Sequence, residues 1–92
     1  ASLCPGGECL DGALLHGLDE RLAALPAERR ARGVVLVLHQ MGSHGPAYAA
    51  RSPAGRKPFQ PECRSPALPQ CDRAALVNAY DNSIAYTDHV LA

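Results

Sequence analysis

The four cysteines of this chain form two local pairs, and they constrain its fold more than any other feature. Cys4 and Cys9 enclose four residues, Cys63 and Cys71 enclose seven, and both intervals contain Pro or Gly residues that can turn the chain back. An even number of cysteines in a short, loop-rich chain favours disulfides between nearest neighbours, each stabilising the fold by roughly 2–3 kcal/mol on the chain-entropy model. A zinc site and free thiols remain as alternatives, although neither pair has the spacing of zinc ribbons. Disulfides imply an oxidising compartment.

Length and charge limit the size of the fold and the kind of partner. The chain has 92 residues, which is enough for one small domain. Its nine Lys and Arg residues balance nine Asp and Glu residues, so the formal net charge is zero. That balance argues against a nucleic-acid partner bound through bulk charge. The longest apolar run, Val34–Leu38, is too short to cross a bilayer.

Hydrophobic periodicity predicts an α/β fold. Leucines at helical spacing predict a first helix, which Pro26 ends because it lacks the backbone N–H. The run Val34–Leu38 is rich in β-branched residues and is typical of a strand buried on both faces. A second helical pattern is still running at Ala92, so we expect the chain to be a fragment of a larger fold. The predicted elements are, in order, a helix over 10–25, a core strand over 33–39, a long disulfide-stapled loop over 40–72 and a helix over 73–92.

The segment His39–Tyr48 holds the densest group of reactive side chains. It follows the predicted strand, at the end where functional groups gather in α/β sheets. A neutral imidazole at His44 could bind a metal or a phosphate-bearing substrate, or move a proton, although a loop histidine is more often an ordinary surface residue. We expect His39 to be a buried framework residue. Ser43 and His44 are sequence neighbours and do not predict a catalytic triad, and Tyr48 either reaches the site or covers it.

Four segments of the chain, in order, resemble one family. Residues 4–19 place the first cysteine pair before LDGALLHGLD, 37–48 read VLHQMGSHGPAY, 57–63 read KPFQPEC, and 78–88 read NAYDNSIAYTD. These segments closely resemble the bacterial phosphoethanolamine transferases, inner-membrane enzymes that modify lipid A and can confer polymyxin resistance. The resemblance covers nearly the whole chain and includes both cysteine pairs.

The resemblance implies a zinc-dependent transferase with an alkaline-phosphatase/sulfatase-like sandwich fold. The catalytic domain would face the periplasm, at the inner membrane, and a transmembrane region would lie outside this chain. A zinc-activated Thr would take phosphoethanolamine from phosphatidylethanolamine, and a lipid A phosphate would then accept it. Nucleic acid has no part in this reaction.

Little of the family's machinery can be placed on these residues. His44 matches the histidine beside the nucleophile, so the resemblance gives it a catalytic role and contacts to substrate or to zinc. We expect Tyr48, in the same loop, to bind substrate. The nucleophilic Thr and most zinc ligands have no counterparts here. The resemblance therefore implies that the chain is part of a periplasmic catalytic domain, inactive alone. Two alternatives remain, a related transferase with another periplasmic glycan or lipopolysaccharide-core acceptor and a non-catalytic disulfide-stapled binding module.

Overall fold

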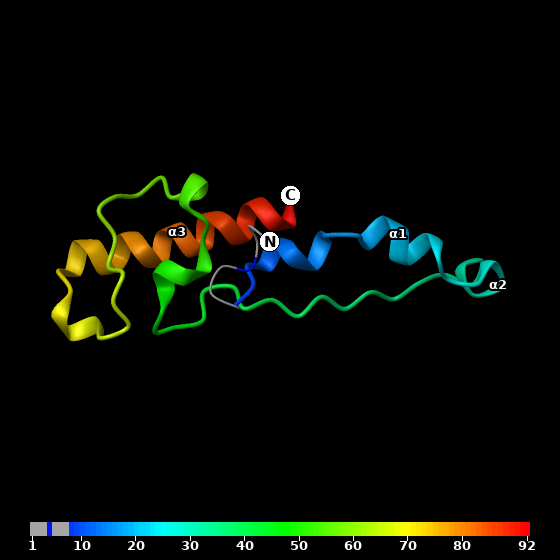
Figure 1. Ribbon diagram of the computed structural model, residues 1–92, viewed down its shortest axis with the longest axis horizontal. Coiled ribbons are helices and arrows are strands. Elements are labelled where there is room, and N and C mark those ends of the chain that lie inside the picture. Colours follow the sequence, from blue (N-terminus) through cyan, green and yellow to red (C-terminus); the bar gives the residue numbers. More distant parts are fainter. Residues whose placement is uncertain (1–3, 5–7) are drawn as a thin grey trace.

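The longest element of the structure, a computed structural model that describes Cys4 and residues 8–92, is helix α3 at Arg73–Leu91. It confirms the helix predicted over 73–92, and Figure 1 shows it along one side of the molecule. The side chains that α3 buries recur at helical spacing, which defines a single packed face. They are Ala79, Asn82, Ser83, Tyr86 and Val90.

The prediction of one continuous helix over 10–25 is wrong. The structure has instead a 3₁₀ helix, η2, at Asp11–Leu15, followed by the α-helix α1 at Leu18–Ala23 and a one-turn α-helix, α2, at Ala27–Arg30. The break falls at Gly17, whose backbone is left-handed with φ of 70°. A right-handed helix cannot continue through such a residue, and glycine adopts this conformation without steric cost. The spacing of the leucines therefore fits one continuous helix, although the backbone breaks that helix at Gly17.

The core strand predicted over 33–39 is also wrong. Within the part of the chain that the structure describes, no segment forms a β-strand, and these residues run in an extended conformation from α2 back towards α3 (Figure 1). Val35 is 92% exposed and Val37 is 82% exposed. A strand requires a neighbouring strand for its hydrogen bonds, and no described residues lie there to supply them. His39, expected to be buried, is exposed for the same reason.

The long loop over 40–72 agrees with the prediction in extent and in its disulfide. It contains three short 3₁₀ helices, η3 at Tyr48–Arg51, η4 at Ala54–Arg56 and η5 at Leu68–Gln70. Cys63 and Cys71 are bonded, and so are Cys4 and Cys9, which confirms the nearest-neighbour pairing. The backbone N–H of Cys63 also donates to the carbonyl of Ala75 on α3 at 2.9 Å. The disulfide thus closes the loop directly onto the start of α3.

A buried polar network joins this loop to the middle of α3. The ammonium group of Lys57 lies 2.8 Å from the carboxylate of Glu62 and 2.9 Å from the hydroxyl of Ser52. The Glu62 side chain is only 1% exposed, and its other oxygen accepts a hydrogen bond from the amide of Asn82 at 3.0 Å. Asn82 also accepts from the N–H of Phe59 and donates to its carbonyl, at 2.9 and 2.8 Å. One fully buried amide therefore holds the loop backbone as a neighbouring strand would.

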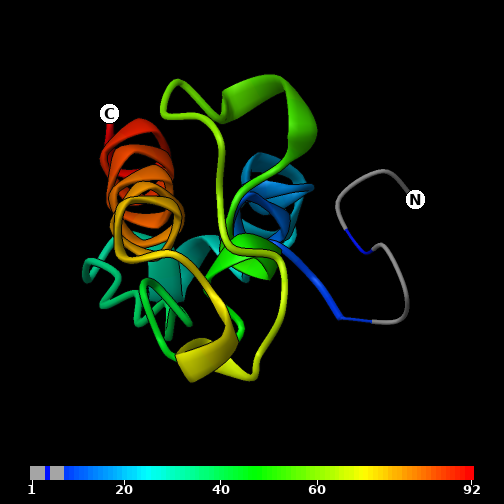
Figure 2. The ribbon, with the colours of Figure 1, turned by 90° about the vertical axis from the view of Figure 1, so that its left-hand side faces the viewer.

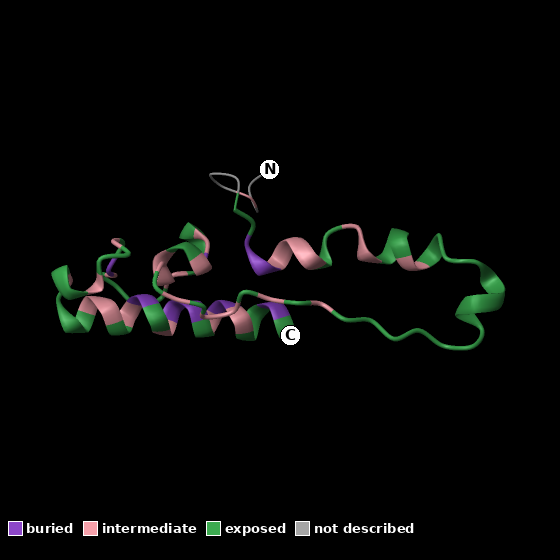
Figure 3. Cartoon of the chain, turned by 90° about the horizontal axis from the view of Figure 1, so that it is seen from below, coloured by how far each residue is buried: buried purple, intermediate pink, exposed green. Residues whose placement is uncertain are grey.

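The molecule is elongated, with extents of 55 × 22 × 20 Å. The view along its length in Figure 2 shows η2 and α3 side by side with the loop arching over them. Figure 3 shows the buried residues along α3 and at the start of η2, whereas α1 and α2 are largely exposed. The small apolar cluster consists of Leu10, Tyr86 and Val90. None of the helices described combines the length and the apolar character that crossing a membrane requires.

Candidate functional site

His44, the residue predicted to contact substrate or metal, lies exposed in a tight turn. Gly42 has a left-handed backbone with φ of 56°, and the N–H of His44 donates to the carbonyl of Met41 at 3.0 Å. The Nδ1 atom of His44 lies 2.6 Å from the carbonyl oxygen of Gly45. Because a carbonyl can only accept, this contact places a proton on Nδ1, and in the neutral form of the ring Nε2 is then the acceptor. The turn therefore presents an imidazole nitrogen that can take a proton or coordinate a metal ion.

The carboxylate of Asp11 holds the backbone of this turn. One of its oxygens accepts from the N–H of Met41 at 2.9 Å, and the other accepts from the N–H of Gly42 at 2.8 Å. Asp11 is only 7% exposed. The next residue, Gly12, donates its N–H to the hydroxyl of Tyr86 on α3 at 3.1 Å. A chain of hydrogen bonds thus runs from α3 through η2 to the turn.

A second hold on the turn comes from Ser83, which is fully buried on α3. Its hydroxyl lies 2.8 Å from the hydroxyl of Ser43 and also contacts the carbonyl of Tyr80. Ser83 has one proton for these two contacts, and the carbonyl can only accept it. The proton between the two hydroxyls therefore comes from Ser43. This arrangement directs the Ser43 proton to Ser83 and away from His44.

Arg51, at the end of η3, is the third residue that fixes the His44 turn. Its Nε donates to the carbonyl of His44 at 2.9 Å, and its terminal nitrogen lies 2.6 Å from the carboxylate of Glu8. The Arg51 side chain is 8% exposed, whereas that of Glu8 is 58% exposed. An ion pair open to solvent on one side contributes little by itself. The bond to the His44 carbonyl is therefore the contact through which Arg51 acts on the turn.

Tyr48 lies against the turn and covers it from one side. A Cβ atom added to Gly45 would lie 2.7 Å from the Tyr48 hydroxyl oxygen and 2.8 Å from the ring carbon that bears it. The Tyr48 ring also meets Tyr80 edge-to-face, with centroids 5.4 Å apart. Tyr48 is half-buried, and its ring packs against Tyr80 of α3 while its hydroxyl lies beside Gly45.

The residues that the structure describes do not by themselves build a metal centre. Among residue 4 and residues 8–92, no three His, Cys, Asp or Glu side chains gather closely enough to hold an ion. All four cysteines are in disulfides, which excludes the cysteine zinc site considered from the sequence. His44 offers a single nitrogen, whereas catalytic zinc sites use three protein ligands. Any zinc here needs ligands from outside these residues.

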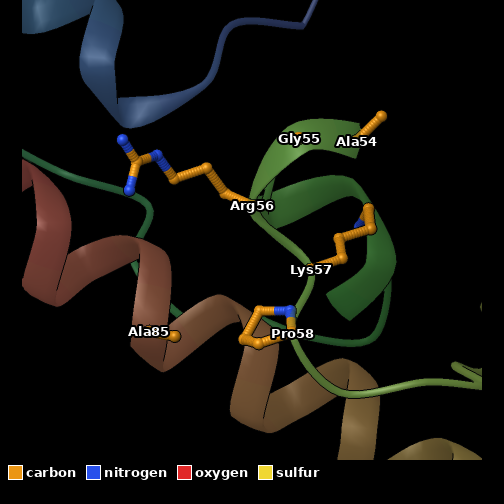
Figure 4. Close-up of a pocket in the computed structure, with 6 residues that line it drawn as sticks. All are labelled: Ala54, Gly55, Arg56, Lys57, Pro58 and Ala85. Atoms are coloured by element: carbon orange, nitrogen blue, oxygen red, sulfur yellow. The ribbon is translucent and has the colours of Figure 1, made fainter.

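Two pockets are lined mainly by residues of the loop. The first, of about 380 Å³, is lined by Ala54, Gly55, Arg56, Lys57, Pro58 and Ala85 (Figure 4). Figure 4 shows the Arg56 side chain extending away from its turn, on the side where Ala85 of α3 lies. The second, of about 410 Å³, shares Lys57 and Ala54 with the first. The residues that line these pockets include neither His44 nor Tyr48.

The sequence comparison defines the class of this protein. The profile of the Sulfatase family matches residues 1–92, and the chain belongs to that family. Among individual proteins, it is 40% identical over 88 residues to the phosphoethanolamine transferase EptA of Escherichia coli strain K12. That match takes in 96% of this chain and 15% of the relative.

Solved structures of phosphoethanolamine transferases also resemble this chain. The chain superposes with a TM-score of 0.81 and 41% identity on the integral membrane protein lipooligosaccharide phosphoethanolamine transferase A of Neisseria meningitidis, covering 96% of this chain and 16% of that one. It superposes with a TM-score of 0.76 and 43% identity on the C-terminal periplasmic domain of phosphoethanolamine transferase EptC from Campylobacter jejuni, covering 89% and 25%. The chain therefore follows the sulfatase fold and spans a minor part of each relative.

Sequence reasoning missed the residues that support the turn. These residues are Asp11, Ser83 and Arg51. Asp11 lies 30 residues from Met41 along the chain, and Ser83 lies 40 residues from Ser43. Nothing in local spacing reports contacts at such separations. The burial of Asp11 agrees with the rule that carboxylates are rarely buried without a partner, but that burial is visible only in the structure.

Proposed function

We propose that the protein containing this chain transfers phosphoethanolamine from phosphatidylethanolamine to lipid A. Residues 1–92 would then form the middle part of its periplasmic catalytic domain. The observation that carries the proposal is the braced His44 turn, which lies within a segment 41% identical, over 96% of this chain, to a lipooligosaccharide phosphoethanolamine transferase. The two disulfides fit a domain that folds in the oxidising periplasm, at the outer face of the inner membrane.

In this proposal His44 contacts the phosphoryl group through Nε2. The Gly45 carbonyl holds Nδ1 protonated, so Nε2 can accept a proton from the group that attacks the phosphorus or return one to the leaving oxygen. Zinc, held mainly by residues outside this chain, would supply Lewis-acid stabilisation of phosphoryl charge. Tyr48 would border the same site and limit the space beside Gly45.

The test is transfer activity of the complete protein after His44→Ala. Donor phosphatidylethanolamine and acceptor lipid A are mixed in detergent or vesicles, and mass spectrometry measures the phosphoethanolamine added to lipid A. We expect a loss of about 100-fold or more, which is the usual contribution of a positioned proton-transfer group. Because the side chain is exposed, the melting temperature should stay close to that of the wild type.

The matched control is His16→Ala, which removes another exposed imidazole from the same chain. We expect this variant to keep wild-type transfer. Absence of transfer to lipid A by the wild-type protein would refute the proposed acceptor, and transfer to a periplasmic glucan or to the lipopolysaccharide core would replace it. Near wild-type transfer by His44→Ala would remove His44 from the reaction.

A further inference from the structure

We infer that Asp11 is a positioning residue for His44, acting through the backbone of the turn that carries it. The inference rests on the proposed function for its activity readout, but its geometry stands independently. Both carboxylate oxygens of Asp11 are engaged, each by one N–H, at Met41 and Gly42. These two residues precede His44 by three and two positions.

The charge of Asp11 makes this contact stronger than an ordinary turn hydrogen bond. Hydrogen bonds to an ionised carboxylate are roughly twice as strong as those between neutral groups. The distances, 2.9 and 2.8 Å, are those of well-formed bonds, and the residue is 7% exposed, so water competes little for the oxygens. The two peptide groups are therefore fixed relative to η2.

The turn has little other packing to hold it at this point. Gly42 has no side chain, and its backbone is left-handed. A Cβ atom added to it would meet nothing within 4 Å among the described residues. Hydrogen bonds therefore determine where the backbone goes between Met41 and His44. Ser43 adds its bond to Ser83, which joins neutral hydroxyls, and the Arg51 guanidinium adds a bond to the His44 carbonyl at the end of this stretch.

Asp11 is itself anchored beside the apolar cluster of the molecule. Leu10, immediately before it, packs in the apolar cluster with Tyr86 and Val90. Gly12, immediately after it, donates to the hydroxyl of Tyr86. The residues before and after Asp11 are thus both fixed to α3, so the Asp11 carboxylate fixes the turn relative to α3.

Asp11→Asn in the complete protein tests this role, because the amide has the same shape but only one accepting oxygen. Its NH₂ group would face one of the two backbone N–H groups, so the turn must shift. We expect kcat for transfer to lipid A to fall about 10- to 100-fold, as for a small misplacement of a catalytic group. We expect KM to change by less than about threefold, because Asp11 would not touch the substrate.

Two further measurements separate positioning from a general loss of structure. Hydrogen–deuterium exchange should speed up at the amides of Met41 and Gly42 and remain unchanged in α3. In a His44→Ala background, Asp11→Asn should reduce the residual transfer by less than about twofold, because residues acting as one unit are not additive. Asp11→Glu, which restores a carboxylate, should recover part of kcat.

The matched control is Asp19→Asn, which makes the same change on an exposed carboxylate of α1. It should leave both exchange and transfer unchanged. Unchanged exchange at Met41 and Gly42 in Asp11→Asn would overturn the inference, and so would an equal loss of kcat with and without His44. A wild-type protein that transfers nothing to lipid A would refute the proposed function instead, while the exchange experiment would still decide the role of Asp11.

Discussion

Asn82 is the residue whose substitution tests most directly how the loop is held on α3. Its side chain is fully buried and makes three hydrogen bonds, two with the backbone of Phe59 and one with the carboxylate of Glu62. Asn82→Asp keeps the shape of the side chain but replaces the donating NH₂ group by an oxygen. The acceptor for the Phe59 N–H survives, whereas both donated bonds are lost.

The magnitude follows from these contacts. Losing a donor to the Phe59 carbonyl costs about 1 kcal/mol, and losing one to a buried carboxylate costs about 1.5–3 kcal/mol. The new oxygen would also lie near the 3.0 Å position now occupied by the donating amide, against the Glu62 carboxylate. Two like charges at that separation repel by about 5 kcal/mol at an effective dielectric constant of 20, before relaxation. Because Lys57 partly neutralises Glu62 and the side chains can move apart, we expect a net destabilisation of about 3–5 kcal/mol.

The assay is urea unfolding of the complete protein, followed by fluorescence or circular dichroism. The control is Asn78→Asp, the same chemical change one turn earlier on α3, where the amide donates only to the carbonyl of Pro61 at 2.8 Å. That variant should lose about 1 kcal/mol. Equal losses for the two variants would refute the reasoning, because the buried carboxylate would then contribute nothing that an ordinary amide bond does not.

Two further predictions concern the turn and the loop. Gly45→Ala should destabilise the protein by about 1–2 kcal/mol, because the new Cβ would displace the Tyr48 ring from Tyr80. The loss should nearly vanish in a Tyr48→Ala background, and equal losses in both backgrounds would contradict the steric explanation. Replacing both Cys63 and Cys71 by Ser should cost about 2–3 kcal/mol on the chain-entropy model, measured as a lower urea midpoint, and an unchanged midpoint would show that the loop is held without its disulfide.

The features that the sequence predicted correctly depend on local information. Helix α3 at Arg73–Leu91, the extent of the loop and both disulfides follow from spacing over a few residues. The prediction over 10–25 failed where a single glycine, Gly17, takes a left-handed conformation that hydrophobic periodicity does not report. The strand over 33–39 failed because strand formation depends on a partner rather than on the segment itself.

In the candidate site, too, the sequence predicted the residue with a local motif and not the residues that contact it from a distance. His44 was identified from its own motif, and the structure adds which ring nitrogen remains available. Its supports were not identified, because Asp11 and Ser83 reach the turn from distant parts of the chain. The roles of His44 and Tyr48 in catalysis stay predictions until transfer is measured.

The exposed run Val34–Leu38 has a consequence for handling this segment in solution. Five consecutive apolar residues with high β-propensity and no charge, held extended with free backbone edges, match the signature of segments that pair between molecules. A preparation that cuts the protein close to these residues would expose a template for aggregation. Boundaries chosen for expression should therefore keep this run together with whatever covers it.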